Sequence, residues 1–191
     1  MIDSRDLFEL ATDFGLGIIG ITNNEPLRKH SEYLKIWQDK GFSGDMNYMK
    51  RSVEMISDPS YLMSSVKSVI SLALFYDRRE REVVQKGYGK IARYAWGKDY
   101  HKVFKRKLKQ FEKKIQEKFK GVETRIVTDS IPYLEKASAE RAKLGFIGKN
   151  TLLIVPGKGS FSLLAEILLS SPVKEYFAEK ELSGKCGDCK K

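Results

Sequence analysis

Residues 99–120 form the segment that most strongly limits how this chain can fold. Six apolar residues recur there at three- and four-residue intervals, which predicts an amphipathic helix with one buried face: Tyr100, Phe104, Leu108, Phe111, Ile115 and Phe119. The other faces carry basic residues: Lys102, Lys105, Arg106, Lys107, Lys109, Lys113, Lys114 and Lys118. Gly121 then ends the helix. Such a helix needs an apolar layer to cover, and the rest of the chain must provide it.

Strands are predicted where short stretches rich in Val, Ile, Leu and aromatic residues are bounded by turn residues. Residues 67–76 give the clearest case. Further strands are predicted over residues 16–22, 87–96, 122–127, 151–155 and 161–169. The last two lie on either side of a turn at 156–159, and the final one could instead be a helix.

Further helices are predicted over residues 4–14, 27–40 and 44–50, the first two ended by Gly15 and Gly41. An irregular linker with one helical turn, residues 51–65, follows them. Another helix is expected to start near Pro132, with Asp129 or Ser130 as its cap, and to end at Gly145. Helices interleaved with a hairpin favour an α+β fold over a strictly parallel α/β fold.

Composition excludes several classes of protein. The chain has 191 residues, of which 41% are hydrophobic, enough for a folded core. Its formal charge of +10 points to a polyanionic partner, although a merely soluble basic surface explains it equally well. No stretch approaches the roughly 18 apolar residues of a membrane helix, so we expect a cytoplasmic protein without a membrane partner. Both cysteines fall in the last six residues, which excludes a disulfide scaffold and suits metal or redox chemistry.

Asp129 is the strongest candidate for catalysis, because it is expected between the end of a strand and the start of a helix. The positive end of the helix would favour its ionised form, whereas burial beside a cofactor would favour the protonated acid. From spacing alone, an ordinary helix cap without a catalytic role is the more common explanation of its position.

A second group of polar residues, Asp99, Tyr100 and His101, opens the long helix. A carboxylate, a phenol and an imidazole together could orient a polar substrate or relay a proton, although a histidine in a first helical turn is often only a surface residue. The other histidine, His30, is expected to be structural.

Two short motifs are less specific. Residues 145–151 form a glycine-punctuated turn that could bring backbone amides and Lys149 close to a ligand, but they match neither a Walker loop nor a dinucleotide fingerprint. The Cys186-x-x-Cys189 pair suits half a zinc knuckle, a thioredoxin-type pair or the start of a bacterial ferredoxin run.

Three blocks together resemble the epoxyqueuosine reductase family. They are residues 37–49 (WQDKGFSGDMNYM), 92–101 (ARYAWGKDYH) and 129–154, in this order and at plausible spacings. The resemblance implies a cobalamin-dependent, iron-sulfur oxidoreductase that removes the epoxide oxygen of the modified wobble base of tRNA, the last step of queuosine synthesis. It also implies a central, mostly antiparallel sheet flanked by helices, similar to cobalamin-processing and reductive-dehalogenase folds. Partners would be tRNA and an electron donor of the flavodoxin or ferredoxin type.

The resemblance also implies roles for individual residues. Asp129 would be the general acid, and Asp99, Tyr100 and His101 would contact the substrate. The cofactor would be approached by Lys136, Gly148, Lys149, Asn150 and Thr151. Lys136 stands where an arginine is common in relatives, so a bidentate contact would become a single one. Cys186 and Cys189 would be the first two ligands of a four-iron four-sulfur cluster.

The family pattern further implies that residues 1–180 are the cobalamin-binding domain and that 181–191 begin a ferredoxin-like domain that is truncated here. Since the later cluster cysteines are missing, we predict that the chain folds and binds cobalamin but is inactive alone. Two other functions remain open from the residues: a non-catalytic basic module that binds RNA through the long helix, and a cobalamin carrier without reductase chemistry.

Overall fold

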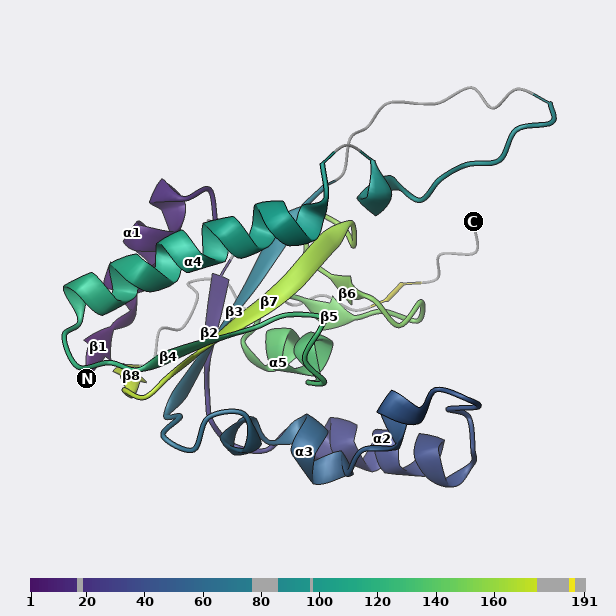
Figure 1. Ribbon diagram of the computed structural model, residues 1–191, viewed down its shortest axis with the longest axis horizontal. Helices are drawn as coiled ribbons and strands as arrows, with labels where there is room; N and C mark the ends of the chain where they lie inside the picture. Colours follow the sequence, from purple (N-terminus) through teal and green to yellow (C-terminus); the bar gives the residue numbers. More distant parts are fainter. Residues whose placement is uncertain (17–18, 77–85, 97, 175–185, 188–191) are drawn as a thin grey trace.

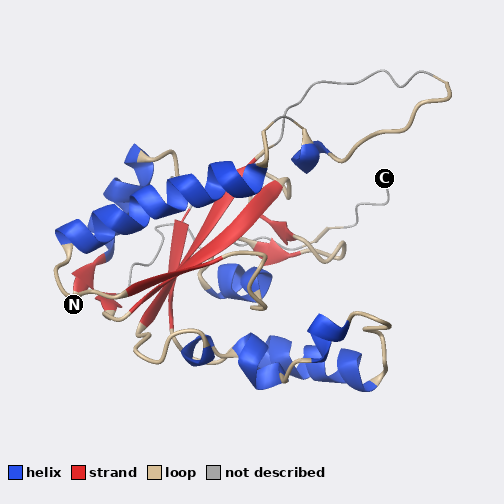
Figure 2. Ribbon diagram, viewed as in Figure 1, coloured by secondary structure: helices blue, strands red, loops and turns tan. Residues whose placement is uncertain are grey.

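A four-stranded antiparallel sheet forms the centre of the protein (Figures 1 and 2). The computed structural model describes residues 1–16, 19–76, 86–96, 98–174 and 186–187. Strand order is β2-β3-β7-β4, with bounds Ile19–Asn23, Ser68–Phe75, Ser162–Leu169 and Thr124–Val127. The two longest strands, β3 and β7, pair over their whole lengths, from Ser68 opposite Leu169 to Phe75 opposite Ser162. The predicted α+β fold with an antiparallel sheet is therefore confirmed.

Helices α1 (Ser4–Asp13) and α4 (Tyr100–Lys118) cover one face of the sheet (Figure 1). The predicted seam of α4 supplies four fully or almost fully buried side chains, and these pack with α1 and the sheet: Phe104, Leu108, Phe111 and Ile115. Lys107 ties the two helices together, because its Nζ donates to the Phe14 carbonyl at 2.9 Å. Lys118 Nζ adds an ion pair of 2.7 Å with Asp6.

The opposite face of the sheet carries α5 (Glu135–Arg141) and a small hairpin of β5 (Phe146–Ile147) and β6 (Leu153–Ile154) (Figure 1). α2 (Arg28–Asp39) and α3 (Val53–Ser57) lie beyond α5 on this side. The chain near α3 is joined to its neighbours by backbone bonds, since Leu27 N donates to Ser57 O at 3.0 Å and Leu134 N to Ile56 O at 3.2 Å.

The prediction of a strand over residues 87–96 is wrong. This segment is a loop with one 3-10 turn, Arg93–Ala95, and it pairs with no strand of the described sheet. Tyr88 and Ile91 are exposed, and the Trp96 indole N–H donates to the Ile91 carbonyl at 2.9 Å. The side chain of Trp96 is thus hydrogen-bonded within residues 87–96 rather than to the sheet. Residues 44–50 likewise give only a 3-10 turn, Asn47–Lys50.

The predicted start and end of the helix after β4 are also wrong. α5 begins at Glu135, three residues after Pro132, and its cap position, Leu134, makes no side-chain cap bond. Its end is made by Lys143, whose φ of 59° is left-handed, rather than by Gly145. Gly145 has another role: a Cβ there would lie 2.2 Å from the Ile154 carbonyl oxygen, so only glycine allows β6 to approach.

One pairing was not predicted at all. β1 (Ile2–Asp3) and β8 (Val173–Lys174) pair in parallel, which joins two segments from opposite ends of the sequence (Figure 1). The expected domain boundary at residues 180 and 181 and most of the charged loop 77–86 lie outside the described residues. Among the described helices, none has both the length and the apolar character needed to span a membrane.

Candidate active site

Asp129 lies on the wall of a cavity of about 450 Å³ at the end of β4. The first turns of α4, the start of β7 and the first turn of α5 complete this wall with Phe104, Leu163, Lys136 and other residues. Asp129 enters the wall from the end of a strand, and polar residues enter it from the first turns of α4 and α5. The sheet contributes apolar side chains. A volume of this size, largely apolar with a few converging polar groups, is typical of a ligand site.

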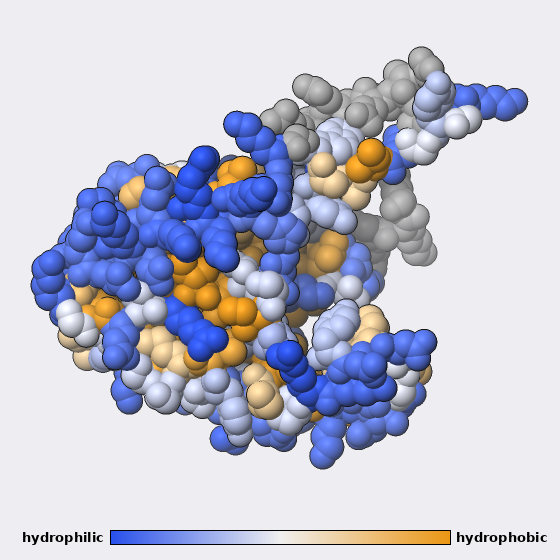
Figure 3. All heavy atoms as spheres, in the orientation of Figure 1, coloured by the Kyte–Doolittle hydropathy of each residue, from blue (hydrophilic) through white to orange (hydrophobic). Residues whose placement is uncertain are grey.

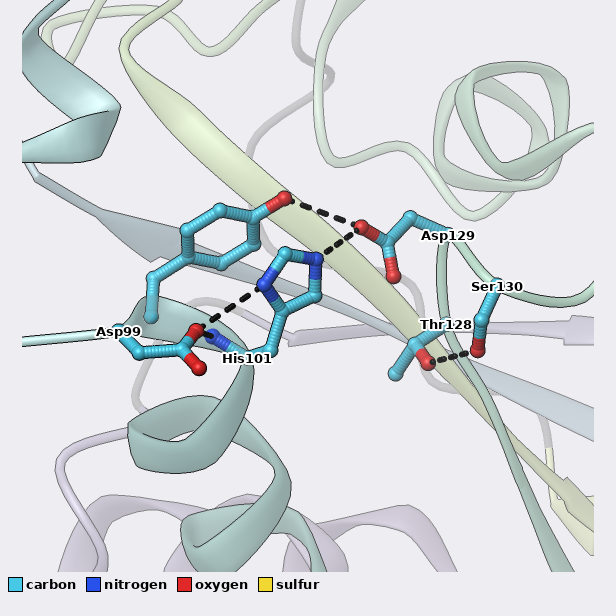
Figure 4. A network of polar contacts seen from close by, with 6 residues as sticks. Asp99, His101, Thr128, Asp129 and Ser130 are labelled. Carbon is cyan, nitrogen blue, oxygen red and sulfur yellow. Dashed lines mark hydrogen bonds and ion pairs between the residues drawn. The ribbon is translucent and has the colours of Figure 1, made fainter.

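The carboxylate of Asp129 accepts two hydrogen bonds from the start of α4 (Figure 4). The Tyr100 hydroxyl lies 3.0 Å from Asp129 Oδ2, and His101 Nε2 lies 2.9 Å from the same oxygen. The rings of Tyr100 and His101 stack at 3.9 Å, which fixes both donors side by side. The structure therefore brings together Asp129 and the predicted polar group of the long helix.

Asp99 holds the other side of His101 (Figure 4). As the N-cap of α4, it accepts the His101 backbone N–H at 3.0 Å, and its Oδ1 lies 3.1 Å from His101 Nδ1. His101 thus bridges two carboxylates, Asp99 and Asp129. A protonated imidazole is the form that donates from both ring nitrogens at once.

These contacts change how the polar groups titrate. Partial desolvation lowers the pKa of His101, but the hydrogen bonds and charges of Asp99 and Asp129 outweigh it, so the pKa lies above the ordinary histidine value. The hydrogen bond with His101 lowers the pKa of Asp99. Desolvation, followed by the bond to Asp129, raises the pKa of Tyr100 to about 12. Tyr100 is therefore a donor that stays protonated, and His101 keeps its proton to a higher pH than an ordinary histidine.

Glu135 is an acid of the cavity wall that sequence reasoning missed. Burial, with the nearby charge of Asp129 as a further cause, raises its pKa to about 8. In the sequence it precedes Lys136 and looks like an ordinary acid in a first helical turn. Only its spacing of six residues from Asp129, across a turn containing proline, could have drawn attention to it.

A second cavity, of about 600 Å³, adjoins the first, because Tyr100 and Leu163 line both. Its wall is rich in aromatic side chains, among them Tyr76, Tyr94 and Trp96. The rings of Tyr94 and Tyr100 meet edge to face at 5.9 Å. The segment of residues 87–96 that was wrongly predicted as a strand thus contributes part of this wall.

The predicted cofactor loop is the turn of the β5–β6 hairpin. Gly148 N donates to Leu152 O at 2.9 Å, Asn150 Oδ1 accepts from Leu152 N at 3.2 Å, and Thr151 has a left-handed φ of 63°. Lys136 Nζ donates to Thr151 O at 2.7 Å and so fixes the loop beside α5. Lys136 and Leu152 line the first cavity, whereas Gly148, Lys149, Asn150 and Thr151 are not among its lining residues.

Cys186 is exposed and lies near this hairpin, since the Lys149 backbone N–H donates a hydrogen bond to its Sγ at 3.3 Å. Cys189 lies outside the described residues. Within the described part of the chain, no group of three or more histidine, cysteine or acidic residues is arranged to hold a metal ion.

The comparisons with known proteins agree with one another. The family described as "Epoxyqueuosine reductase QueG, DUF1730" matches residues 57–130. An epoxyqueuosine reductase of Leadbetterella byssophila is 36% identical over 97% of this chain and 61% of its own length.

Two solved structures have the same fold. An epoxyqueuosine reductase from Streptococcus thermophilus matches with a TM-score of 0.84 and 29% identity, over 97% of this chain and 50% of that one. An epoxyqueuosine reductase solved with an epoxyqueuosine-modified stem loop of tyrosine tRNA matches with a TM-score of 0.84 and 28% identity. The match covers 97% of this chain and 49% of that one. The chain spans about half to three fifths of the length of these proteins. The resemblance predicted from the sequence is therefore confirmed: the chain is a relative of the epoxyqueuosine reductases.

Proposed function

We propose that this chain is the cobalamin-binding and proton-donating part of an epoxyqueuosine reductase, an oxidoreductase acting on tRNA in the cytoplasm. The observation that carries the proposal is the position of Asp129, on the wall of a cavity and bonded by Tyr100 and His101, in a fold shared with epoxyqueuosine reductases. Removal of an epoxide oxygen as water consumes two electrons and two protons. The reaction thus needs both an electron source and a proton donor.

The two adjoining cavities suit a large cofactor with an apolar ring face and polar edges, such as the corrin of cobalamin. Tyr100 and Leu163 line both cavities, which therefore lie side by side, and Lys136 lines the first cavity and is bonded to the hairpin turn. Cobalamin, when bound, would supply the electrons that cleave the carbon–oxygen bond. The predicted role of Lys136 and of residues 148–151 is to hold the edge of the cofactor by polar contacts.

A four-iron four-sulfur cluster, by contrast, does not fit the residues of this chain. Such a cluster takes four thiolates, whereas the chain contains two cysteines, Cys186 and Cys189. Their proposed role is to supply two of the four ligands. We expect the chain to be inactive until the other ligands and an electron donor of the flavodoxin or ferredoxin type are added.

The side chains around Asp129 define the proton chemistry. Asp129 would donate its proton to the oxygen that leaves, since an unprotonated alkoxide is a poor leaving group. Tyr100 and His101 hold the carboxyl of Asp129 in place through Oδ2. His101, half exposed and held between two carboxylates, could return a proton from solvent to Asp129.

The basic surface of α4 is the proposed site of contact with tRNA. Hydrophilic side chains cover this helix in the space-filling view (Figure 3). Lys102, Lys105, Arg106, Lys109 and Lys113 surround a shallow hollow of about 470 Å³. These basic residues continue from the turn that carries His101, so phosphates bound there would run toward the cavity.

The test starts with cobalamin alone. After incubation with cobalamin and gel filtration, the chain is expected to keep the corrin absorption band, and the complete loss of the band would reject the cofactor assignment. Asp129→Asn should keep the band. In the enzyme completed with the remaining part of the Leadbetterella byssophila relative, Asp129→Asn should abolish formation of queuosine in an epoxyqueuosine-containing stem loop. Asp39→Asn, at the end of α2, is the matched control and should leave turnover unchanged.

A further inference from the structure

A separate cavity lies between the start of α2 and the end of α5. Its volume is about 600 Å³, within the range of small-molecule sites. Among the described residues, none that lines it also lines either cavity of the candidate active site. Part of the wall is apolar, with Pro26 and Leu27 before α2 and Ala137 of α5. The rest of the wall consists of charged and titratable side chains.

Three basic side chains from two helices line this cavity. Arg28 and Lys29 belong to the first turn of α2, and Arg141 is the last residue of α5. The first turn of α2 contains no acidic residue, and its N-cap, Leu27, makes no side-chain cap bond. Because the N-terminal end of a helix is itself positive, cations there add to its field rather than offset it. The cavity therefore collects positive charge from both helices.

The two acids of the wall do not neutralise the three basic side chains. Glu140 is already bonded on both oxygens: Oε2 lies 3.1 Å from His30 Nε2, and Oε1 accepts the Ile147 backbone N–H at 2.9 Å. Glu25 is exposed and, in the part of the chain that the structure describes, its carboxylate forms no ion pair. The same holds for the three basic side chains. The cavity is thus left with an excess of positive charge.

Arg141 is the least solvated of these cations. Burial lowers its pKa, yet a guanidinium stays protonated at neutral pH. Its Nη1 donates to the Glu25 carbonyl at 2.5 Å and its Nη2 to the Asn23 carbonyl at 3.0 Å. Its Nε is buried and has no acceptor among the described residues. A partly desolvated charge that meets only neutral carbonyls is unfavourable, and an anion beside the guanidinium would offset that cost.

We propose that the cavity between α2 and α5 binds the phosphate group of a small molecule through Arg28, Lys29 and Arg141. Basic side chains that approach from two helices, next to the N-terminal end of one of them, suit an anion with several oxygens. The cavity is much larger than a phosphate ion, so the apolar part of its wall is left to contact the organic part of the ligand. An RNA backbone, by contrast, fits the open basic surface of α4.

The site is tested on the chain itself by NMR during addition of inorganic phosphate. We expect saturable shifts of the Arg141 Nε–H signal and of the backbone amide signals of Arg28 and Lys29. Adenosine monophosphate should move the same signals, whereas adenosine, which lacks the phosphate, should not. The absence of a saturable shift with both phosphate and adenosine monophosphate would reject the site. Equal shifts with adenosine would show that the cavity does not recognise phosphate.

A pair of substitutions tests the basic side chains. Arg28→Gln with Lys29→Gln changes exposed residues and should leave the fold intact, while weakening the binding of adenosine monophosphate by about tenfold or more. The ligand should also raise the urea midpoint of the wild type but not that of this variant. Lys35→Gln with Lys90→Gln removes the same charge from exposed positions outside the cavity and is the matched control. Equal weakening by both pairs would contradict a local site.

Two sources supply a phosphate group of this kind: free phosphate esters and the phosphodiester in the nucleotide part of cobalamin. Cobinamide, the corrin without that nucleotide, separates them. If cobalamin moves the Arg141 Nε–H signal and cobinamide does not, the cavity takes the phosphate of the cofactor. If adenosine monophosphate moves the signal and cobalamin does not, the cavity takes a free ester. The titration with phosphate needs neither corrin nor turnover, so its failure is distinct from a failure of the proposed function.

Discussion

His101 is the residue whose behaviour depends most directly on its neighbours in the site. It touches Asp99 through Nδ1 and Asp129 through Nε2, at 3.1 and 2.9 Å. The same two carboxylates are what hold its pKa above the ordinary value against desolvation. The charge state of His101 is therefore a reporter of whether Asp129 lies in the position described here.

Replacing Asp129 by Asn should lower the pKa of His101, because one of the two stabilising charges disappears. The measurement is an NMR titration of the imidazole signals, which is simple because the chain has two histidines. His30 serves as the internal control, since it contacts Glu140 at 3.1 Å rather than Asp129. An unchanged His101 midpoint would mean that the two side chains do not meet in solution.

At this scale the sequence predicted which residues belong to the site but not how they touch. Asp129 and the group of residues 99–101 came from motifs far apart in the chain, and their contact at 2.9 to 3.0 Å depends on the packing of α4 beside β4. Glu135 was missed for the same reason, and so was the burial of Glu166. Glu166 lies in an alternating strand at a position that sequence reasoning expects to be polar and exposed, whereas the structure covers it with α5.

At the scale of single elements, Asp99 both starts α4 and orients His101. Asp99→Ala removes the cap and should lower the free energy of unfolding by about 0.5–2 kcal/mol. Asp99→Asn keeps a capping oxygen and should be much closer to wild type, while both variants lower the pKa of His101. Urea denaturation and NMR titration separate the two effects. Equal stability of the Ala and Asn variants would show that the cap is not formed.

The basic face of α4 gives a second prediction for this element. Arg106→Glu with Lys109→Glu should weaken binding of a tRNA stem loop, since both residues border the hollow on the exposed side of the helix. Each lost phosphate contact should also reduce the salt dependence of binding by about 0.9 in log–log slope for duplex regions. Lys29→Glu with Lys35→Glu on α2 changes the net charge equally and is the matched control. Equal weakening by both pairs would indicate unspecific attraction.

Elements whose apolar residues are buried in the structure were predicted well, and those with exposed or very short patterns were not. α4 has one buried apolar face, and most residues of β3 are buried on both faces of the sheet. Their apolar patterns in the sequence therefore predict their structures. Residues 87–96 alternate like a strand but have no partner to pair with, so alternation alone misled the prediction. The β1–β8 pairing involves two residues on each side, too few to produce a pattern.

For the whole molecule, the seating of α5 on the sheet links the core to the site. α5 carries Glu135 and Lys136 into the wall of the cavity, and Gly20 is the point where its far end contacts β2. A side chain at Gly20 would push against a backbone carbonyl of Ala142 rather than against a flexible side chain, so the helix or the strand must move. Movement at the C-terminal end of α5 would tilt the helix and so change the cavity wall at its N-terminal end.

Gly20→Ala should therefore lower both stability and cofactor retention. Overpacking of this kind costs about 1–3 kcal/mol, measured as a lower urea midpoint. The corrin band retained after gel filtration should decrease in the same variant even when it is fully folded at the temperature used. Gly89→Ala is the control, because a Cβ there meets nothing within 4 Å and the change should stay within about 0.5 kcal/mol of wild type. A Gly20→Ala protein that loses stability but keeps the corrin fully would show that the cavity does not depend on how α5 is seated.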